Sequence, residues 1–380
     1  MNLDNLKCMV DLHLHLDGAI SIESAKKLAE IQNIQIPEKD EDILKLLRVS
    51  PDCRDLNEFL EKFAFPCSLL QSEIGIKTAV QNLTKELEEQ GVMYAEIRFA
   101  PQKLTEKGLS QKEVVAAALD GAKNSPVAVQ FILCAMRDDN NKEENLESVR
   151  VAKEYLGKGV CAVDLAGAEG IFPNENFGYL FEYAKEEGVP FTVHAGEADG
   201  ANSVKSALDF GACRIGHGVR AIEDAELSKR IAREQIPLEL CPSSNLCTCV
   251  FRDICEYPLM QMIRLGIRVT VNTDDPSIEN TTLKNEYNLL ADNFDLKEDD
   301  IKALLENSVF ASFASKEEKA KMIARIEQEF EKEKEKRIAL YKEQKKTLNT
   351  FLSNGAITKK QYDKSLGDLQ RLMEIPAELC

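Results

Sequence analysis

The chain of 380 residues carries 48 Lys and Arg against 65 Asp and Glu, and its net charge of −17 argues against polymeric nucleic acid as a substrate, because phosphate backbones are bound by clustered basic residues. Its hydrophobic fraction of 44% suits a globular protein with a large core, and no run of about 18 uncharged apolar residues predicts a membrane span. The N-terminus lacks the pattern of a secretory signal and the 11 scattered cysteines form no disulfide framework, so we expect a cytoplasmic protein with reduced, mostly buried thiols.

Short apolar runs alternate with longer amphipathic stretches along the chain. This alternation is typical of βα units that build a parallel sheet, whose strands are buried on both faces. The predicted strands are Met9–Leu14, Val92–Phe99, Val127–Cys134, Cys161–Ala166, Pro190–Ala195, Arg214–Gly216, Pro237–Cys241 and Arg268–Asn272. Eight strands with helical returns predict the α/β fold class and a closed (β/α)8 TIM barrel.

The predicted helical returns follow the same order along the chain. They are Ile74–Gln90, Gln111–Ala122, Glu144–Leu156, Asn176–Glu187, Ala201–Phe210, Ile222–Gln235 and Pro258–Leu265. Glycine follows four of them, at Gly91, Gly188, Gly211 and Gly266, where a left-handed cap often ends a helix.

The segment Glu30–Leu70 is longer than one βα connection needs. In it Leu56, Phe59, Leu60 and Phe63 recur at helical spacing. An ordinary amphipathic helix packed on the barrel would explain this stripe. Only the position of the segment, soon after the first strand, favours the alternative that it forms a lid covering a site.

The pattern changes from about Lys316 onward. Glu327–Lys346 is predicted to form a long charged helix and Thr358–Met373 a second one, behind the turn at Ser353–Gly355. Such charged blocks usually form a solvated face or an interaction segment. We therefore predict a barrel domain of residues 1–315 and a C-terminal helical appendage of residues 316–380, which is a candidate for self-association.

All four histidines of the chain are placed where predicted strands end. His13 and His15 share one face at the end of the first strand, His194 ends the fifth and His217 follows the sixth. A single buried histidine would usually be a core residue with satisfied ring nitrogens. Because the carboxyl ends of barrel strands meet at one rim, we expect these four imidazoles to converge on a metal site.

Carboxylates accompany the histidines at the same predicted rim. The eighth strand runs into Asp274 and Asp275, and Glu197 lies three residues after His194. Three imidazoles and one carboxylate suit zinc, with iron, cobalt and manganese as competitors, and a water bound to such an ion has a pKa near 7. This chemistry favours hydrolysis, with Glu197 as a proton donor and His217 holding or deprotonating the water. The simpler alternatives are a surface carboxylate for Glu197 and a helix N-cap for Asp275.

Six motifs in the same order resemble the adenosine deaminase family of metal-dependent hydrolases, from residue 9 to about 310. They are His13-Leu-His-Leu-Asp-Gly18, Asp164-Leu-Ala-Gly167, His194-Ala-Gly-Glu197, Ile215-Gly-His-Gly218, Cys241-Pro-Ser-Ser-Asn245 and Asn272-Thr-Asp-Asp-Pro276. The resemblance implies a (β/α)8 barrel that holds one zinc ion. It also implies hydrolytic deamination of a small purine nucleoside, adenosine and also deoxyadenosine, to the inosine product and ammonia.

The resemblance also implies roles for individual residues. The implied metal ligands are His13, His15, His194 and Asp274. Glu197 would protonate purine N1, His217 would stabilise the attacking hydroxide and Asp274 would orient it. The other expected substrate contacts are His15 beside the metal, Asp275 to N7, the Gly167 N–H to N3 and Asp17 to the ribose 5′-hydroxyl. Outside the shared motifs, we predict that Leu56, Phe59 and Phe63 shield the base.

Three other functions have less support in the sequence than nucleoside deamination: deamination of adenine or a modified adenosine, ester or amide hydrolysis with two metals, and non-catalytic binding. Adenine-specific relatives tend to carry Glu where this chain has Asp17, which favours the nucleoside over adenine or a modified adenosine. A two-metal ester or amide hydrolase on the same barrel often needs a Lys on the fourth strand, and Cys161–Ala166 has none. A non-catalytic binding protein would not need the full set of ligands and acid–base groups. After the Cys-Pro-x-Ser-Asn motif, many relatives continue with Gln-Thr-Gly, whereas this chain has Leu246–Val250. The resemblance therefore does not imply the structure of this loop or of any cavity wall that it forms.

Overall fold

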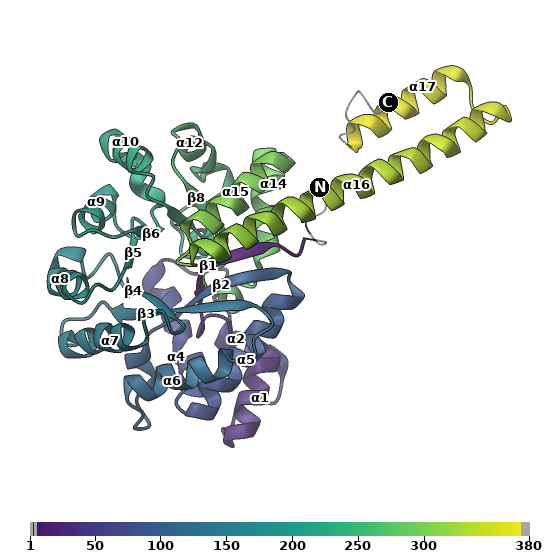
Figure 1. Ribbon diagram of the computed structural model, residues 1–380. Coiled ribbons are helices and arrows are strands. Elements are labelled where there is room, and N and C mark those ends of the chain that lie inside the picture. The colour runs from purple at the N-terminus through teal and green to yellow at the C-terminus, as the bar shows by residue number, and fades with distance from the viewer. Residues whose placement is uncertain (1–2, 4–5, 374–380) are drawn as a thin grey trace. The chain divides into compact units, whose positions relative to one another are not determined.

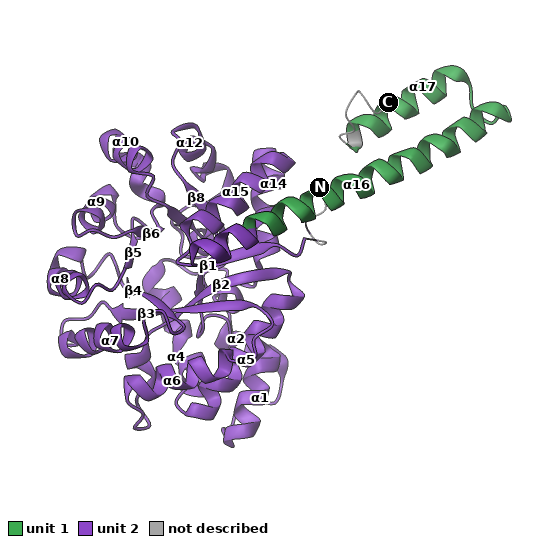
Figure 2. Ribbon diagram, in the orientation of Figure 1, with its two compact units in different colours: residues 1, 323–380 green, residues 2–322 purple. Residues whose placement is uncertain are grey.

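The computed structural model describes residue 3 and residues 6–373, and it divides into two compact units (Figure 2). One unit comprises Asn2–Met322 and the other runs from Ile323 onward. The predicted domain boundary between residues 315 and 316 stays a prediction. Within the described residues, no helix is both long and apolar enough to cross a membrane.

The first unit contains eight parallel strands. They are β1 (Met9–His15), β2 (Val92–Phe99), β3 (Ala128–Met136), β4 (Val160–Ala166), β5 (Thr192–Ala195), β6 (Arg214–His217), β7 (Leu238–Leu240) and β8 (Val269–Val271). They pair in chain order as β1-β2-β3-β4 and β5-β6-β7-β8. All eight predicted strands are therefore confirmed, within two residues at every end.

Two seams join these four-stranded sheets into a closed barrel. At the first seam, between β4 and β5, Val163 N–H donates to the Pro190 carbonyl at 3.0 Å. At the second, which lies between β1 and the end of β8, Asp274 N–H donates to the His13 carbonyl and His15 N–H donates to the Asp274 carbonyl, both at 2.8 Å. The predicted TIM-barrel fold is confirmed.

Helices surround the strands (Figure 1). Those of the first unit are α1 (Ile22–Gln32), α2 (Asp40–Leu47), α3 (Leu56–Leu60), α4 (Ala64–Leu69), α5 (Glu73–Glu89), α6 (Gln111–Ala122), α7 (Lys142–Tyr155), α8 (Gly178–Glu186), α9 (Ala201–Asp209), α10 (Ala225–Glu234), α11 (Pro242–Cys247), α12 (Leu259–Arg264), α13 (Pro276–Glu279), α14 (Leu283–Phe294) and α15 (Glu298–Ala311). The seven predicted helical returns correspond to α5 to α10 and α12. Sequence reasoning missed α1, although its N-cap Ser21 accepts a hydrogen bond from Ser24 N–H, a recognisable start signal.

The barrel interior contains charged residues as well as apolar ones. Glu96, Arg98, Arg214 and Glu239 are almost completely buried. Arg214 pairs with Glu96 at 2.6 Å and also with Glu239, so opposite charges alternate inside the barrel. Removing one partner of such a buried pair leaves an uncompensated charge, which is strongly destabilising.

The C-terminal helices are α16 (Lys316–Ser353) and α17 (Lys359–Leu372). Both helices were predicted, but α16 extends beyond the expected Glu327–Lys346 at each end. A capping box between Thr358 and Gln361 begins α17.

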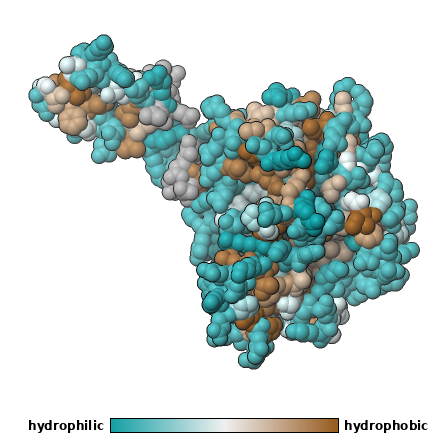
Figure 3. All heavy atoms as spheres, turned by 180° about the vertical axis from the view of Figure 1, so that it is seen from behind, coloured by the Kyte–Doolittle hydropathy of each residue, from teal (hydrophilic) through white to brown (hydrophobic). Residues whose placement is uncertain are grey.

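Figure 3 shows a largely hydrophilic surface with separate apolar patches on the face in view. The nine described cysteines other than Cys8 are free thiols, and four of them are buried.

Candidate active site

Four side chains from three strand ends converge at one rim of the barrel. The possible ligand atoms of His13, His15, His194 and Asp274 all lie within 4.8 Å of one another. His194 Nε2 is 3.0 Å from His13 Nε2 and 3.3 Å from His15 Nε2, and Asp274 Oδ1 is 3.1 and 3.3 Å from the same two atoms. Atoms held tetrahedrally at 2.0–2.1 Å from one zinc ion lie about 3.3 Å apart. The four residues therefore fit a single divalent cation.

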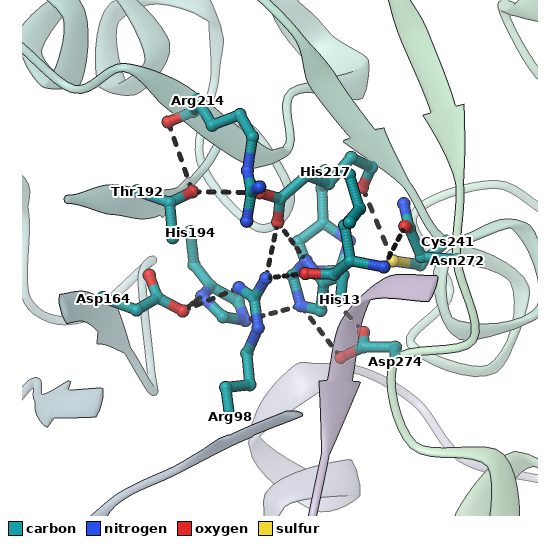
Figure 4. A network of polar contacts seen from close by, with 12 residues as sticks. His13, Arg98, Asp164, Thr192, His194, Arg214, His217, Cys241, Asn272 and Asp274 are labelled. Carbon is teal, nitrogen blue, oxygen red and sulfur yellow. Dashed lines mark hydrogen bonds and ion pairs between the residues drawn. The ribbon is translucent and has the colours of Figure 1, made fainter. Parts of the chain in front are cut away.

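Buried carboxylates orient two of these imidazoles (Figure 4). His13 Nδ1 lies 2.8 Å from Glu239 Oε2, and His194 Nδ1 lies 2.8 Å from Asp164 Oδ2. Burial opposes ionisation of Glu239, but Arg214 and Arg98 outweigh it and hold the pKa of that carboxyl well below its usual range. A carboxylate that accepts Nδ1–H leaves the Nε2 lone pair free for a metal.

Arg98 joins these two carboxylates. One guanidinium nitrogen donates to Asp164 Oδ2 at 2.8 Å, and the other donates to Glu239 Oε2 at 2.8 Å and to the Leu12 carbonyl at 2.7 Å. The side chain is fully buried. A single guanidinium therefore fixes both groups that orient His13 and His194.

We expect Arg98→Gln to weaken the affinity for a divalent cation by about 10–100-fold, because the orienting carboxylates lose their shared partner. Competition with a chromophoric chelator measures this affinity, and circular dichroism checks that the variant is folded. Arg150→Gln, on the exposed surface of α7, is the matched control. An unchanged affinity in folded Arg98→Gln would show that Arg98 does not support the site.

The backbone at two of the site residues is left-handed. Asp274 has φ of 62° and His217 has φ of 59°, values that residues other than glycine rarely adopt. Asp274 is fixed there by its two main-chain hydrogen bonds to β1. Close packing also matters at Gly216, where an added Cβ would lie 3.0 Å from His13 Cε1. Backbone strain of this kind is often found at functional sites.

Glu197 lies in the loop after β5 and is buried, so the alternative of a surface carboxylate is wrong. Its Oε1 accepts a hydrogen bond from Thr248 Oγ1 at 3.4 Å, and its Oε2 is 3.6 Å from His217 Nε2. Burial, and then the negative charge of Asp274, raise the pKa of Glu197 well above its usual range. This shift favours the protonated carboxyl, which is the form that can donate a hydrogen bond or a proton.

His217 is held in one tautomer by its neighbours. Tyr257 Oη donates to Asn245 Oδ1 at 3.1 Å, which turns Asn245 Nδ2 toward His217 Nδ1 at 3.2 Å. Burial lowers the pKa of His217, so the ring is neutral and its proton resides on Nε2. Nε2 is 3.6 Å from both Glu197 Oε2 and Asp274 Oδ2. This arrangement favours a residue that holds a water over one that deprotonates it.

A cavity of about 490 Å³ opens beside this cluster. The seven side chains and backbone positions predicted to contact a substrate all line it: His15, Asp17, Leu56, Phe59, Phe63, Gly167 and Asp275. Leu56 and Phe59 of α3 also pack against Cys53 and Ile278, so the predicted stripe serves both as core and as cavity wall. Other lining residues that sequence reasoning missed come from β3 and its neighbourhood, among them Met136 and Arg137.

Two carboxyl oxygens in the cavity wall lack a hydrogen-bond partner among the described residues. They are the buried Asp17 Oδ1 and Asp275 Oδ1, whereas Asp17 Oδ2 accepts from Cys67 Sγ at 3.5 Å. Asp275 precedes α13, but its side chain makes no capping hydrogen bond. Gly18 lies under Asp275, and an added Cβ there would be 1.7 Å from Asp275 Oδ1. Buried polar atoms without a partner in the chain indicate that a polar ligand completes the site.

The family model described as adenosine deaminase matches residues 8–329. This chain belongs to the adenosine deaminase family. The chain is 44% identical over 335 residues to an adenosine deaminase of Haemophilus ducreyi, which covers 85% of this chain and 96% of the relative. It is 38% identical over 324 residues to an adenosine deaminase of Clostridium acetobutylicum, which covers 84% and 96%.

Solved structures extend the comparison to the fold of the family. The crystal structure of an adenine deaminase from Arthrobacter aurescens superposes with a TM-score of 0.76 at 28% identity, and the match covers 85% of this chain and 98% of that one. The resemblance inferred from the six sequence motifs is therefore confirmed at the level of the adenosine deaminase family.

Sequence reasoning brought together the residues at the strand ends and missed those behind them. It assigned no role to Arg98, Glu239 or Asn245, although each contacts a predicted site residue or its carboxylate partner. A signal was present, because Arg98 and Glu239 are charged residues within short apolar strands. A charge at such a position has to find a buried partner.

Proposed function

We propose that this chain deaminates adenosine, and also deoxyadenosine, by hydrolysis at purine C6, releasing the inosine product and ammonia. The observation that carries the proposal is the arrangement in one cavity of a four-residue cluster that fits a metal and of the buried Glu197 carboxyl, whose pKa is raised. Family membership supports the reaction class. Adenine is the second candidate substrate, because an adenine deaminase is among the structural relatives.

His13, His15, His194 and Asp274 would hold one zinc ion, the ion that best suits three imidazoles and a carboxylate. When bound, such an ion lowers the pKa of a water ligand to about 7 and supplies a nucleophile at neutral pH. Iron, cobalt and manganese remain competitors for the same ligands. The orienting carboxylates Glu239 and Asp164 keep the two imidazoles in the ligand tautomer.

Glu197 would donate a proton to purine N1. Attack at C6 breaks the aromaticity of the purine and pushes negative charge onto N1. A protonated Glu197 that faces N1 gives up its proton there and stabilises the transition state more than the ground state. His217 Nε2–H donates to the attacking oxygen and Asp274 orients it. As the bond between C6 and the amino nitrogen breaks, the amino group takes the proton of the added hydroxyl and leaves as ammonia. The proton that the water lost on becoming the nucleophile returns to Glu197.

The remaining groups of the wall would recognise the purine nucleoside. Burial, and then the charge of Asp274, raise the pKa of Asp275 well above its usual range, so its carboxyl can donate a hydrogen bond to N7. The Gly167 N–H would donate to N3, and Asp17 would accept from the ribose 5′-hydroxyl through its partnerless oxygen. Leu56, Phe59 and Phe63 would shield the base.

Ultraviolet spectroscopy of separate substrates tests this function. Purified protein is incubated with adenosine, deoxyadenosine, adenine and N6-methyladenosine, each with and without a chelator. We expect the spectral change of deamination with the two nucleosides, and its loss with the chelator. A faster reaction with adenine would make the chain an adenine deaminase, and no change with any substrate would overturn the proposal.

Phe63→Ala is expected to raise the KM for adenosine about 10-fold with kcat little changed, because the ring buries apolar surface of the base in both ground and transition states. The Phe63 ring is half-buried, 6.3 Å from the His15 ring and 6.2 Å from the Phe59 ring between centroids. Steady-state kinetics measures the change, with the exposed Phe351→Ala as the control. An unchanged KM would return Phe63 to a packing role.

Two further proposals concern the setting of the enzyme. A cytoplasmic location is supported by the free state of the nine described cysteines other than Cys8, since reduced thiols persist there. Self-association through α16 and α17 stays a prediction, which light scattering of the full chain and of a chain ending at residue 322 would test.

A further inference from the structure

Glu169 is a buried carboxylate in the loop after β4 that the proposed reaction does not use. Its two oxygens accept hydrogen bonds from four consecutive backbone N–H groups: Gly196 at 2.6 Å, Glu197 at 3.0 Å, Ala198 at 2.8 Å and Asp199 at 3.0 Å. Ser203 of α9 donates to the same carboxylate. Charge-assisted hydrogen bonds are about twice as strong as neutral ones, so this one side chain fixes the whole loop.

That loop carries Glu197, whose side chain is held only loosely by its neighbours. Thr248 Oγ1 and His217 Nε2 lie 3.4 and 3.6 Å from its oxygens. The main chain of Glu197 is held firmly instead. Its N–H donates to Glu169, and its carbonyl accepts from Arg220 Nε at 2.9 Å.

The backbone conformation of the loop depends on the same carboxylate. Gly196 is left-handed, with φ of 71°, and an added Cβ there would lie 2.4 Å from Val204 Cγ2. Four N–H groups can point at one acceptor only while the chain turns in this way. Without the acceptor, the buried N–H groups of Gly196 and Glu197 would be unsatisfied, and the loop would have reason to rearrange.

We propose that Glu169 is the positioning residue for the proton donor: it fixes the loop 196–199 so that the Glu197 carboxyl faces the reacting purine. This inference rests on the proposed function. A displacement of a reacting group by about 1 Å can cost roughly 10²-fold in rate. Glu169 is therefore expected to influence kcat without touching the substrate or the metal ligands.

The test is a double-mutant cycle on the metal-loaded full chain, with adenosine as substrate. Glu169→Gln keeps the size of the side chain but removes the charge and turns one acceptor into a donor. We expect kcat to fall about 10²-fold, with KM changed less than about 3-fold and the metal content unchanged. Glu169→Asp should restore part of kcat. Glu175→Gln, an exposed glutamate nearby in the chain, is the matched control.

The decisive variant combines Glu169→Gln with Glu197→Gln. If Glu169 acts through Glu197, the combined variant is about as active as Glu197→Gln alone, since residues that act as a unit are not additive. If the two losses multiply, or if Glu169→Gln loses its metal, the role of Glu169 is general support of the fold and the inference is overturned. Unchanged kcat in Glu169→Gln overturns it as well. A wild-type chain that leaves adenosine intact refutes the proposed function instead.

Discussion

Replacing Glu197 by Gln is expected to lower kcat by about 10²–10³-fold while the metal ion stays bound. The amide cannot supply the proton that N1 needs, whereas its size and its neighbours Thr248 and His217 remain the same. Because burial raises the pKa of Glu197 and so favours its neutral form, a neutral amide of the same size suits the same surroundings. We therefore expect its thermal stability to be close to that of the wild type.

Steady-state rates on adenosine and elemental analysis of the same preparation measure this prediction. Glu226→Gln, an exposed glutamate of α10, controls for the substitution itself. A Glu197→Gln variant with full activity would remove Glu197 from the mechanism. A variant that has lost its ion would place Glu197 among the groups that support the metal.

Removing the ion is expected to lower the rate by about 10⁴-fold or more, because a water with a pKa of about 7 on a divalent cation returns to about 15.7 without it. The loss should be reversible, since Arg98, Asp164 and Glu239 hold the imidazoles independently of the ion. The metal-free protein should also melt at a lower temperature, because an ion that binds only the folded state stabilises it.

Dialysis against a chelator, followed by stepwise addition of zinc, cobalt or manganese, measures both the loss and its recovery. The control is the same dialysis with the chelator saturated by zinc. Full turnover by protein in which elemental analysis finds no transition metal would contradict the proposed chemistry. Recovery with manganese but not zinc would correct the identity of the ion.

Much of this fold could be predicted because it depends on local patterns. The eight strands are short apolar runs, and their order follows from the right-handed βα connections of a barrel. The site could be predicted for the same reason, since His15, His194 and His217 lie at or next to the last residue of strands whose carboxyl ends share a rim. A residue at a strand end needs no knowledge of side-chain packing to be placed there.

The supporting residues could not be predicted in this way. Glu169 meets the loop 196–199 across about thirty residues of chain, and only the packed structure brings the two together. The left-handed backbone of Asp274 could not be predicted either. The sequence Asp-Asp-Pro is equally compatible with a helix that begins at an Asp275 N-cap, and it gives no sign of a left-handed residue before it. The helices α14 and α15 were not predicted, because they follow the last strand and so lie beyond the alternation of strands and helices that marks the other helical returns.

Asp274 belongs to two structures at once. Its main chain, just after the last strand, forms hydrogen bonds to the first strand and so closes the barrel. Its side chain belongs to the cluster with the imidazoles. A local opening of the barrel at this place would therefore withdraw a ligand, and an ion in the cluster would resist that opening. The ion would therefore stabilise the closure of the barrel as well as activate the water, and Asp274 would take part in both effects.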